Sequence, residues 1–222
     1  SSTSRGLGDV YKRQVEDYMN LIIDKMRSEL KLHCFDSMQA YNNPKPRHEW
    51  CFDWSSQLGL VVNQIYWCSE VEEAFDKMAA GDAGAMKKYS EQQVQQITDL
   101  IATTRRDLDK PSRQKIMNMI TIDAHSRDMV ISIVENGENS KKCFKWMSQL
   151  RTYWDADIDD SVIKICDAFF PYGYEYLGNG GRLVITPLTD RIYITATQAC
   201  WLSMGTALSL IHISEPTRRR GI

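Results

Sequence analysis

The feature that most constrains this fold is a helical spacing of apolar side chains, which recurs along the chain from Val15 to Val134. In its first stretch an apolar residue stands at every third or fourth position, which places the set on one face of an amphipathic helix. The set is Val15, Met19, Ile22, Met26 and Leu30. We expect this helix to run to Tyr41 and to end before Pro44 and Pro46, because proline disrupts helical pairing.

The same spacing predicts two further helices downstream. The second helix should end near Gly81, and its apolar stripe is Leu58, Val61, Val62, Ile65, Cys68, Val71 and Phe75. The third should span about Ala85 to Asp107 and carry a polar, glutamine-rich outer face. Stripes of this kind indicate helices that pack on one another through one face each.

A fourth helix is predicted after Asp109, which is a favourable N-cap residue, with Pro111 in its first turn. Its expected core face holds Ile116, Ile120, Val130, Ile133 and Val134. The turn-forming sequence NGENS should end it. Phe144–Tyr153 is then predicted to form a shorter helix.

The pattern changes after Asp160. SVIKICDAFF alternates and is rich in β-branched and aromatic residues, and YGYEYLG and RLVIT flank an Asn-Gly turn, which predicts a β-hairpin. Thr186 as N-cap, Pro187 as first helical residue and Asp190 near the positive end of the dipole predict a final helix. The β-branched run IYIT leaves a strand there as the alternative. The predicted fold class is mainly α: a helical bundle, then a small β-hairpin and a helix.

The two ends of the chain do not share this periodicity. SRGLGDVYKRQ near the start and LSLIHISEPTR near the end can be encoded by two DNA strings that are reverse complements of each other. Both strings resemble a transposon-end adapter used in sequencing libraries. We therefore interpret Ser1–Gln14 and Leu208–Ile222 as translated adapter rather than as part of the fold. The alternative is a genuine polar tail at each end.

Charge and composition exclude several classes of protein. Without the two ends the chain has 21 basic and 27 acidic residues, a net charge of −6, against −2 for the whole sequence. This balance gives no indication of nucleic-acid binding. No apolar run approaches the roughly 18 residues of a membrane span, and no secretory signal is recognisable. The six cysteines form no C-x-x-C pair, so we expect free, mostly buried thiols rather than a metal or redox site.

The sequence DAHSRD is a candidate for acid–base or metal chemistry, because it places Asp123, His125 and Asp128 close together. On a helix, His125 and Asp128 would be neighbours. No second histidine or carboxylate stands one turn further on to complete a ligand set. A hydrogen-bonded structural histidine is therefore the preferred interpretation.

Aromatic and glycine-rich features also have a structural interpretation. Five of the six tryptophans fall among apolar helical positions, which favours core packing over a stacking platform; they are Trp50, Trp54, Trp67, Trp146 and Trp154. The glycine-rich stretch GNGG, Gly178–Gly181, has no lysine and no following helix in phosphate-loop order. It is therefore interpreted as a turn.

Four longer stretches carry a family resemblance. YGYEYLGNGGRLVITPLTDRIYITATQA, Tyr172–Ala199, closely resembles the entry into the first AAA+ module of dynein heavy chains. QIYWCSEVEEAF (Gln64–Phe75), ITIDAHSRDMV (Ile120–Val130) and FKWMSQLRTYW (Phe144–Trp154) resemble the distal linker of the same family. Order and spacing agree across Val15–Ala207, and the likeness is closer to axonemal outer-arm heavy chains than to cytoplasmic dynein.

The resemblance implies a division of the chain at Asp160. Residues 15–160 would be the C-terminal part of the linker, a helical rod that lies across a ring of six AAA+ modules. Residues 161–207 would begin the first module and give the C-terminal end α+β character. In this family the linker changes shape as the first module binds and hydrolyses ATP, which drives movement along microtubules. The chain would then be a fragment of a microtubule motor.

The resemblance also implies a nucleotide contact. In this family the stretch VITPLT lies against the adenine, and the matching positions here are Val184, Ile185, Pro187, Leu188 and Thr189. The alternative is that these residues only pack a strand onto a helix. The phosphate loop G-x-x-x-x-G-K-[ST], expected after Gly205, is absent from this sequence, as are catalytic and metal-binding residues. ATP or ADP with Mg²⁺ is thus implied for the parent protein, whereas this chain should neither hydrolyse ATP nor bind it tightly.

The partners implied are the rest of the heavy chain with its AAA+ ring, and, through the parent, intermediate chains, light chains and microtubules, with no nucleic acid and no membrane. The implied location is the cytoskeleton of a ciliary or flagellar axoneme. The rival interpretation is a stand-alone helical interaction module without motor activity. A clean sequence beyond Ala207 would separate the two, because the motor reading requires a Walker loop within about 15 residues.

Overall fold

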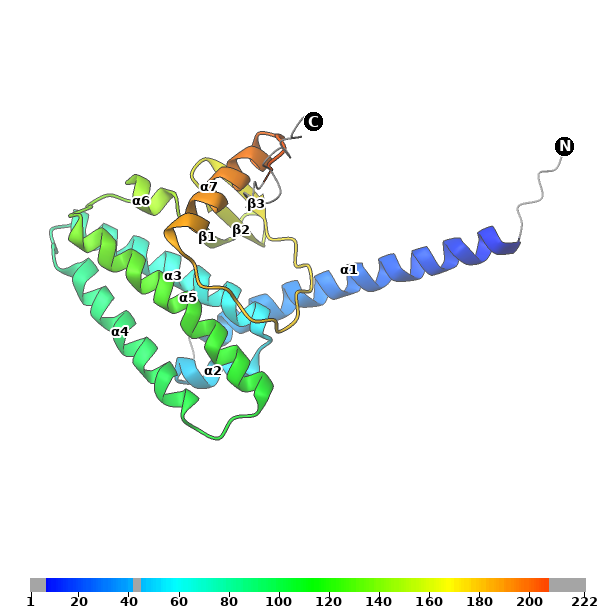
Figure 1. Ribbon diagram of the computed structural model, residues 1–222, viewed down its shortest axis with the longest axis horizontal. Coiled ribbons are helices and arrows are strands. Elements are labelled where there is room, and N and C mark those ends of the chain that lie inside the picture. The colour runs from blue at the N-terminus through cyan, green and yellow to red at the C-terminus, as the bar shows by residue number, and fades with distance from the viewer. Residues whose placement is uncertain (1–6, 42–44, 208–222) are drawn as a thin grey trace, which may run out of the picture.

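The computed structural model describes residues 7–41 and 45–207, with side chains from Gln14 onward. The order of elements (Figure 1) is α1 Leu7–Tyr41, α2 Arg47–Asp53, α3 Ser56–Ala79, α4 Ala85–Thr104, α5 Lys110–Glu135, α6 Phe144–Met147, β1 Arg151–Asp155, β2 Asp160–Ile165, β3 Ala168–Pro171 and α7 Pro187–Trp201. The described part is therefore mainly helical with one small sheet near its end, which confirms the predicted fold class.

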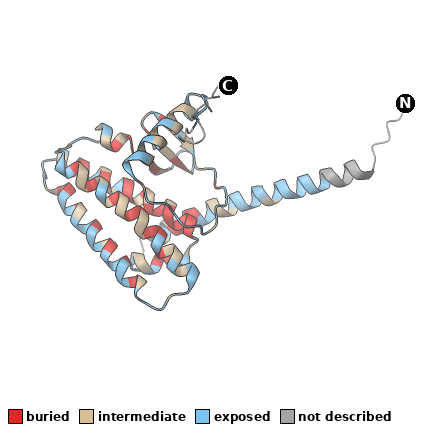
Figure 2. Ribbon diagram, in the orientation of Figure 1, coloured by how far each residue is buried: buried red, intermediate tan, exposed pale blue. Residues whose placement is uncertain are grey.

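Helix α1 ends at Tyr41, as the sequence predicts. Pro44 lies outside the described residues, while Pro46 takes the N-cap position of α2. The N-terminal half of α1 projects away from the rest of the chain (Figure 1), and of its side chains that are described, from Gln14 onward, most are exposed (Figure 2). Of the predicted apolar stripe, Val15, Met19 and Met26 are exposed, so only the C-terminal part of α1 contributes to the core.

Helices α3, α4 and α5 form the helical body, with α3 at its centre. α3 starts at a cap in which the Leu58 N–H donates to Ser55 Oγ at 3.4 Å, and it ends just before Gly81. Gly81 has φ +112°, a backbone conformation that side chains rarely allow, so glycine is suited to end the helix there. The second predicted helix is confirmed.

Helices α4 and α5 confirm the next two predictions with small corrections. α4 ends at Thr104 rather than near Asp107. Asp109 takes the N-cap position of α5, but its side chain makes no capping hydrogen bond. On the predicted core face Ile116, Val130 and Ile133 are buried and Ile120 is half-buried, whereas Val134 is exposed. The prediction that Val134 lies in the core is wrong, since it lies in the last turn of α5 and is 37% exposed.

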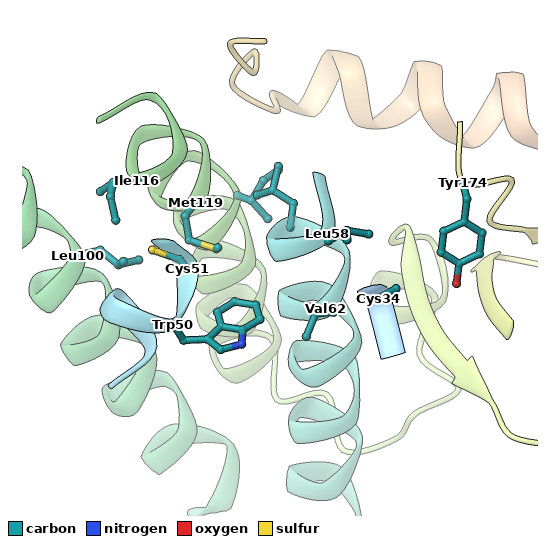
Figure 3. Packing of buried hydrophobic residues seen from close by; sticks show 11 residues of the cluster. Cys34, Trp50, Cys51, Leu58, Val62, Leu100, Ile116, Met119 and Tyr174 are labelled. Carbon is teal, nitrogen blue, oxygen red and sulfur yellow. The ribbon is translucent and has the colours of Figure 1, made fainter. Parts of the chain in front are cut away.

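Two buried clusters hold the body together. The first joins α1, α2, α3, α4 and α5 to the segment after β3 (Figure 3) and consists of Cys34, Trp50, Cys51, Leu58, Leu60, Val62, Leu100, Ile116, Met119, Ile122 and Tyr174. The second joins the C-terminal half of α3 to α4, α5 and α6, and includes Trp67, Cys68, Phe75, Met86 and Trp146. Helix α2, which the sequence analysis did not predict, brings Trp50 and Cys51 into the first cluster.

The sheet is antiparallel with the order β1-β2-β3, and Tyr153 pairs with Val162 and Ile163 with Phe170. The predicted helix over Phe144–Tyr153 is therefore wrong beyond Met147, since Arg151 onward forms β1. Strand pairing overrides local helical preference here because β1 finds a partner in β2 and also packs on α3.

The hairpin predicted around the Asn-Gly turn is also misplaced. The hairpins form at β1–β2 and β2–β3, the latter turning through Cys166, whose φ is +47°. Residues 172–186, which we call the strap, form neither a helix nor a strand. The strap crosses from the sheet to the helical body and returns to α7 (Figure 1).

Helix α7 matches its prediction closely. The Thr189 N–H donates to Thr186 Oγ1 at 3.3 Å, and the Thr186 N–H donates to Thr189 Oγ1 at 2.8 Å. Pro187 is the first helical residue, and the strand alternative for IYIT is not observed. Gln198 of α7 donates to the Ile165 carbonyl at 2.9 Å, which ties the helix to the sheet. Among the described residues, none of the helices combines the length and apolar character needed to cross a membrane.

Candidate functional site

The residues predicted to meet a nucleotide lie together at the end of the strap and in the first turn of α7. Val184 and Leu188 are 71% and 68% exposed, Pro187 is exposed and Thr189 is half-buried. Ile185 differs from these, because it packs against the first core cluster. The set therefore offers an open apolar surface beside a helix N-terminus, suited to a flat apolar group. It presents no cation that would hold phosphates.

The strap passes α3 before it reaches this surface. There Gln57 of α3 makes three hydrogen bonds to the strap. Gln57 Nε2 donates to the Tyr172 hydroxyl at 2.8 Å and to the Glu175 carbonyl at 2.7 Å. The Leu177 N–H in turn donates to Gln57 Oε1 at 3.0 Å. Since Gln57 lies in the first turn of α3, this side chain joins the helical body directly to the strap backbone.

Asn118 of α5 makes a second attachment further along the strap. Its Nδ2 donates to the Gly180 carbonyl at 2.9 Å, and the Arg182 N–H donates to Asn118 Oδ1 at 3.2 Å. Asn179 adds a hydrogen bond of 3.2 Å to the Pro111 carbonyl. The predicted turn character of the GNGG stretch is partly confirmed, since Gly178 has φ +68°.

Tyr174 anchors the start of the strap in the core beside Cys34 (Figure 3). Its side chain is only 4% exposed, and its hydroxyl donates to Ser161 Oγ at 2.9 Å. Burial raises the pKa of both Tyr174 and Cys34, so the phenol and the thiol stay neutral near pH 7. The group is a packing anchor rather than a nucleophilic site.

A hollow of about 390 Å³ lies beneath the strap, between α3, α5 and the sheet. Its walls include Gln57, Asn118 and Ile163, and the strap glycines close one side. Arg182 is the one charged residue among the described residues that line it. A nucleoside triphosphate needs several paired cations and amides, so this hollow is not a triphosphate site.

The DAHSRD residues do not form a joint site. His125 Nε2 lies 3.0 Å from Gln149 Oε1, and Asp128 pairs with its neighbour Arg127 at 2.6 Å. Asp123 instead faces Arg47, at 2.7 Å. Within the described ranges no cluster of three His, Cys, Asp or Glu side chains could hold a metal. The preferred structural interpretation of His125 agrees with this arrangement.

A polar network that the sequence pattern did not predict lies inside the helical body. Arg47 of α2 forms hydrogen bonds with Asp123 of α5 and Asn63 of α3, and Asn63 donates to Asp123 at 2.9 Å. The Tyr89 hydroxyl donates to Glu70 at 2.8 Å on the other side of a small cavity. No local pattern announces this network, because its members come from four different helices.

Glu70 gives this network a testable pH dependence. Burial raises its pKa above the usual 4.5, so the folded chain binds this proton more readily than the unfolded chain. The free energy of unfolding therefore falls as the pH rises from 4.5 through the raised pKa. We expect Glu70→Gln, which keeps an acceptor for Tyr89, to gain stability relative to the unaltered chain at pH 7.5 but not at pH 4.5. Urea unfolding at both pH values measures this.

Glu73→Gln is the matched control, because Glu73 is exposed one turn away and pairs with Lys77. Its stability difference from the unaltered chain should not grow with pH in the stabilising direction. A Glu70→Gln variant whose relative stability is the same at both pH values would contradict the assignment.

The tryptophans and cysteines are mainly structural, as predicted. Trp50, Trp67 and Trp146 are buried, while Trp54 and Trp154 are half-buried. All six cysteines are free; Cys34, Cys51 and Cys68 are buried, Cys143 and Cys166 are half-buried and Cys200 is exposed. Burial raises the pKa of Cys51 to about 11 and that of Cys68 to about 12, which leaves both as unreactive thiols.

Comparison with known proteins connects the strap to an ATP-binding region. The family model described as the hydrolytic ATP binding site of the dynein motor region matches residues 172–209, so the match begins where the strap begins. Residues 208–209 of the match lie outside the described residues. The matched range contains every residue predicted to meet a nucleotide.

Relatives that align with most of the chain are also dynein chains. The chain is 66% identical over 196 residues to the dynein alpha chain, flagellar outer arm, of Chlamydomonas reinhardtii. It is 43% identical over 194 residues to the ciliary dynein beta chain of Tripneustes gratilla and to dynein axonemal heavy chain 9 of Homo sapiens. These alignments cover 88%, 87% and 87% of this chain but only 4% of each relative.

A helical body that continues into the dynein ATP-binding match defines the chain as a segment of a dynein motor region. The chain belongs to the dynein heavy chain family. Within that family it is of the axonemal type, which is named for cilia and flagella. These findings confirm the resemblance noted in the sequence, including its axonemal character.

Proposed function

We propose that this chain is the junction between the distal linker and the first AAA+ module of an axonemal dynein heavy chain. Residues 15–160 form the end of the linker, and residues 161–207 begin the module. In the parent protein the junction transmits ATP-driven changes of the ring to the linker and so contributes to movement along microtubules. The parent also assembles with intermediate and light chains, while residues 1–14 and 208–222 remain interpreted as adapter.

The observation that carries this proposal is the attachment of the strap to the helices. The ATP-binding match starts at Tyr172, and Tyr172 itself accepts a hydrogen bond from Gln57 of α3. The matched region is therefore bonded to the helical body from its first residue. A displacement near the nucleotide would reach α3 and α5 through these contacts rather than through a flexible connection.

Nucleotide contact is proposed for the residues already singled out, Val184, Ile185, Pro187, Leu188 and Thr189. Their apolar atoms would cover the adenine, while ATP or ADP with Mg²⁺ is held by the phosphate loop of the complete protein. Because this sequence lacks that loop's lysine and Ser/Thr, we propose that the chain by itself neither hydrolyses ATP nor binds it tightly.

The proposal predicts a defined loss in a full-length heavy chain that carries this segment. Leu188→Ala removes apolar atoms that would lie on the adenine, at about 0.8 kcal/mol for each buried CH₂. We expect the affinity for ATP to fall about tenfold. Titration with a fluorescent ATP analogue measures this directly.

Leu183→Ala is the matched control, because Leu183 is 90% exposed on the same segment and is not one of the proposed contacts. Its ATP affinity should stay within about twofold of the unaltered protein. Equal losses in both variants, or no loss in Leu188→Ala, would count against an adenine contact at this surface.

A further inference from the structure

We propose that Gln57 and Asn118 form a two-point latch that holds the strap on α3 and α5 and couples the nucleotide-facing residues to the helical body. That Gln57 and Asn118 hold the strap follows from the fold alone. That they couple the nucleotide-facing residues to the helical body rests on the proposed function. Gln57 and Asn118 are thus two positioning residues of the junction.

The strap needs an external hold because it has little pairing of its own. Within the described residues, no backbone-to-backbone hydrogen bond involves residues 173–185. Backbone N–H and C=O groups that leave water must find partners elsewhere. For the strap, side chains from the helical body provide several of these partners.

The two amides bind the strap in the same way. Gln57 donates to the Glu175 carbonyl and accepts from the Leu177 N–H two residues later. Asn118 donates to the Gly180 carbonyl and accepts from the Arg182 N–H, again two residues later. One residue of a parallel strand pairs with its neighbour in this pattern. Each side-chain amide therefore takes the place of one residue of an absent neighbouring strand.

Both amides are buried and committed to this arrangement. Gln57 is 7% exposed and Asn118 is 2% exposed. Asn118 Oδ1 is also held by Gln114 Nε2, at 3.1 Å, and Gln57 Nε2 by the Tyr172 hydroxyl. Buried amides that lost the strap would be left with unmet hydrogen bonds, which is unfavourable. The closed latch is therefore the stable state.

The strap is held under strain at its start, which suits a latch. Tyr174 has φ +47°, a left-handed conformation that is unfavourable for a residue with a large side chain. Such a conformation persists where the surroundings over-determine it, and here the buried tyrosine ring and its bond to Ser161 do so. At the other end Gln198 ties α7 to the sheet. The latch lies between these two anchors.

Hydrogen–deuterium exchange on the 222-residue chain tests the holding. In the Gln57→Leu/Asn118→Leu double variant, we expect the amides of Leu177 and Arg182 to exchange at least about tenfold faster than in the unaltered chain. Exchange in the core of α5, around Ile133, should stay unchanged and so report an intact fold. Unchanged exchange at Leu177 and Arg182 in a folded variant would overturn the latch.

Gln64→Leu is the matched control, because Gln64 lines the same hollow on α3 but bonds to Ser126 rather than to the strap. It should leave strap exchange unaltered, and strap exchange as fast as in the double variant would overturn the assignment to Gln57 and Asn118. If the double variant does not fold, exchange in the unaltered chain still tests whether the strap is held. Its Leu177 and Arg182 amides should exchange at least about tenfold more slowly than an unstructured peptide, and the absence of this protection would overturn the proposal.

The coupling is tested on the full-length heavy chain with and without ATP. We expect nucleotide to change exchange in peptides covering 172–182 by at least about threefold, because the bound segment and the latch are contiguous. ATP binding without any change in these peptides would overturn the coupling. Failure of Leu188→Ala to weaken binding would instead contradict the proposed function, while the exchange result on the isolated chain would still support the latch.

Discussion

Replacing Asp123 by alanine is expected to reduce the free energy of unfolding by about 3–5 kcal/mol, because it leaves a buried guanidinium without its counter-charge. The side chains of Arg47 and Asp123 are 14% and 10% exposed, and they lie 2.7 Å apart. Asn63 also loses the carboxylate to which it donates. Urea unfolding followed by circular dichroism measures the change.

A double variant separates the loss of a partner from the loss of the pair. Arg47→Met/Asp123→Leu removes both charges, and we expect it to recover most of the stability, since apolar replacements of a buried pair are often near neutral. Glu73→Ala breaks the exposed pair with Lys77 and should cost under about 1 kcal/mol. A double variant as unstable as Asp123→Ala would show that the charge imbalance is not the cause.

Trp146→Ala is expected to cost about 3–5 kcal/mol, the range for removing a large aromatic side chain from a core. Trp146 is 0% exposed, and its ring meets that of Trp67 edge-on at 5.1 Å. The Arg151 guanidinium lies 5.9 Å from the same ring. The substitution should therefore loosen the start of β1 as well as helix α6.

Trp201→Ala is the control for losing a tryptophan as such. Trp201 is 46% exposed and meets Phe170 at 6.0 Å, so its removal should cost about 1 kcal/mol or less. Guanidinium unfolding of the two variants gives the comparison. Equal and small losses at both positions would mean that the second core cluster does not depend on Trp146.

The helices were predictable because each is encoded by its own segment. The spacing of apolar residues gave α1, α3, α4 and α5, and Thr186 with Pro187 gave the start of α7. The failures occur where pairing partners decide the conformation. Arg151–Asp155 became a strand because β2 lies beside it, and the flanks of the Asn-Gly turn stayed unpaired because Gln57 and Asn118 bind their backbone.

The candidate site was also predictable only in part. The family resemblance supplied the residues from Val184 to Thr189, and their contact with a nucleotide stays a proposal. The surrounding contacts could not be anticipated, because Gln57 and Leu177 are 120 positions apart and Arg47 and Asp123 are 76 apart. Interactions across such separations leave no periodic signal in a single sequence.

The sequence by itself therefore determined the mainly helical class, the caps and ends of most helices, and the dynein resemblance that the comparisons then confirmed. Only the tertiary structure decided which strands pair, which charges are buried and how the strap is held. The physical reason is the range of the interactions: helical periodicity and capping act within a few residues. Strand pairing, buried ion pairs and amide-to-backbone contacts exist only after distant segments have packed together.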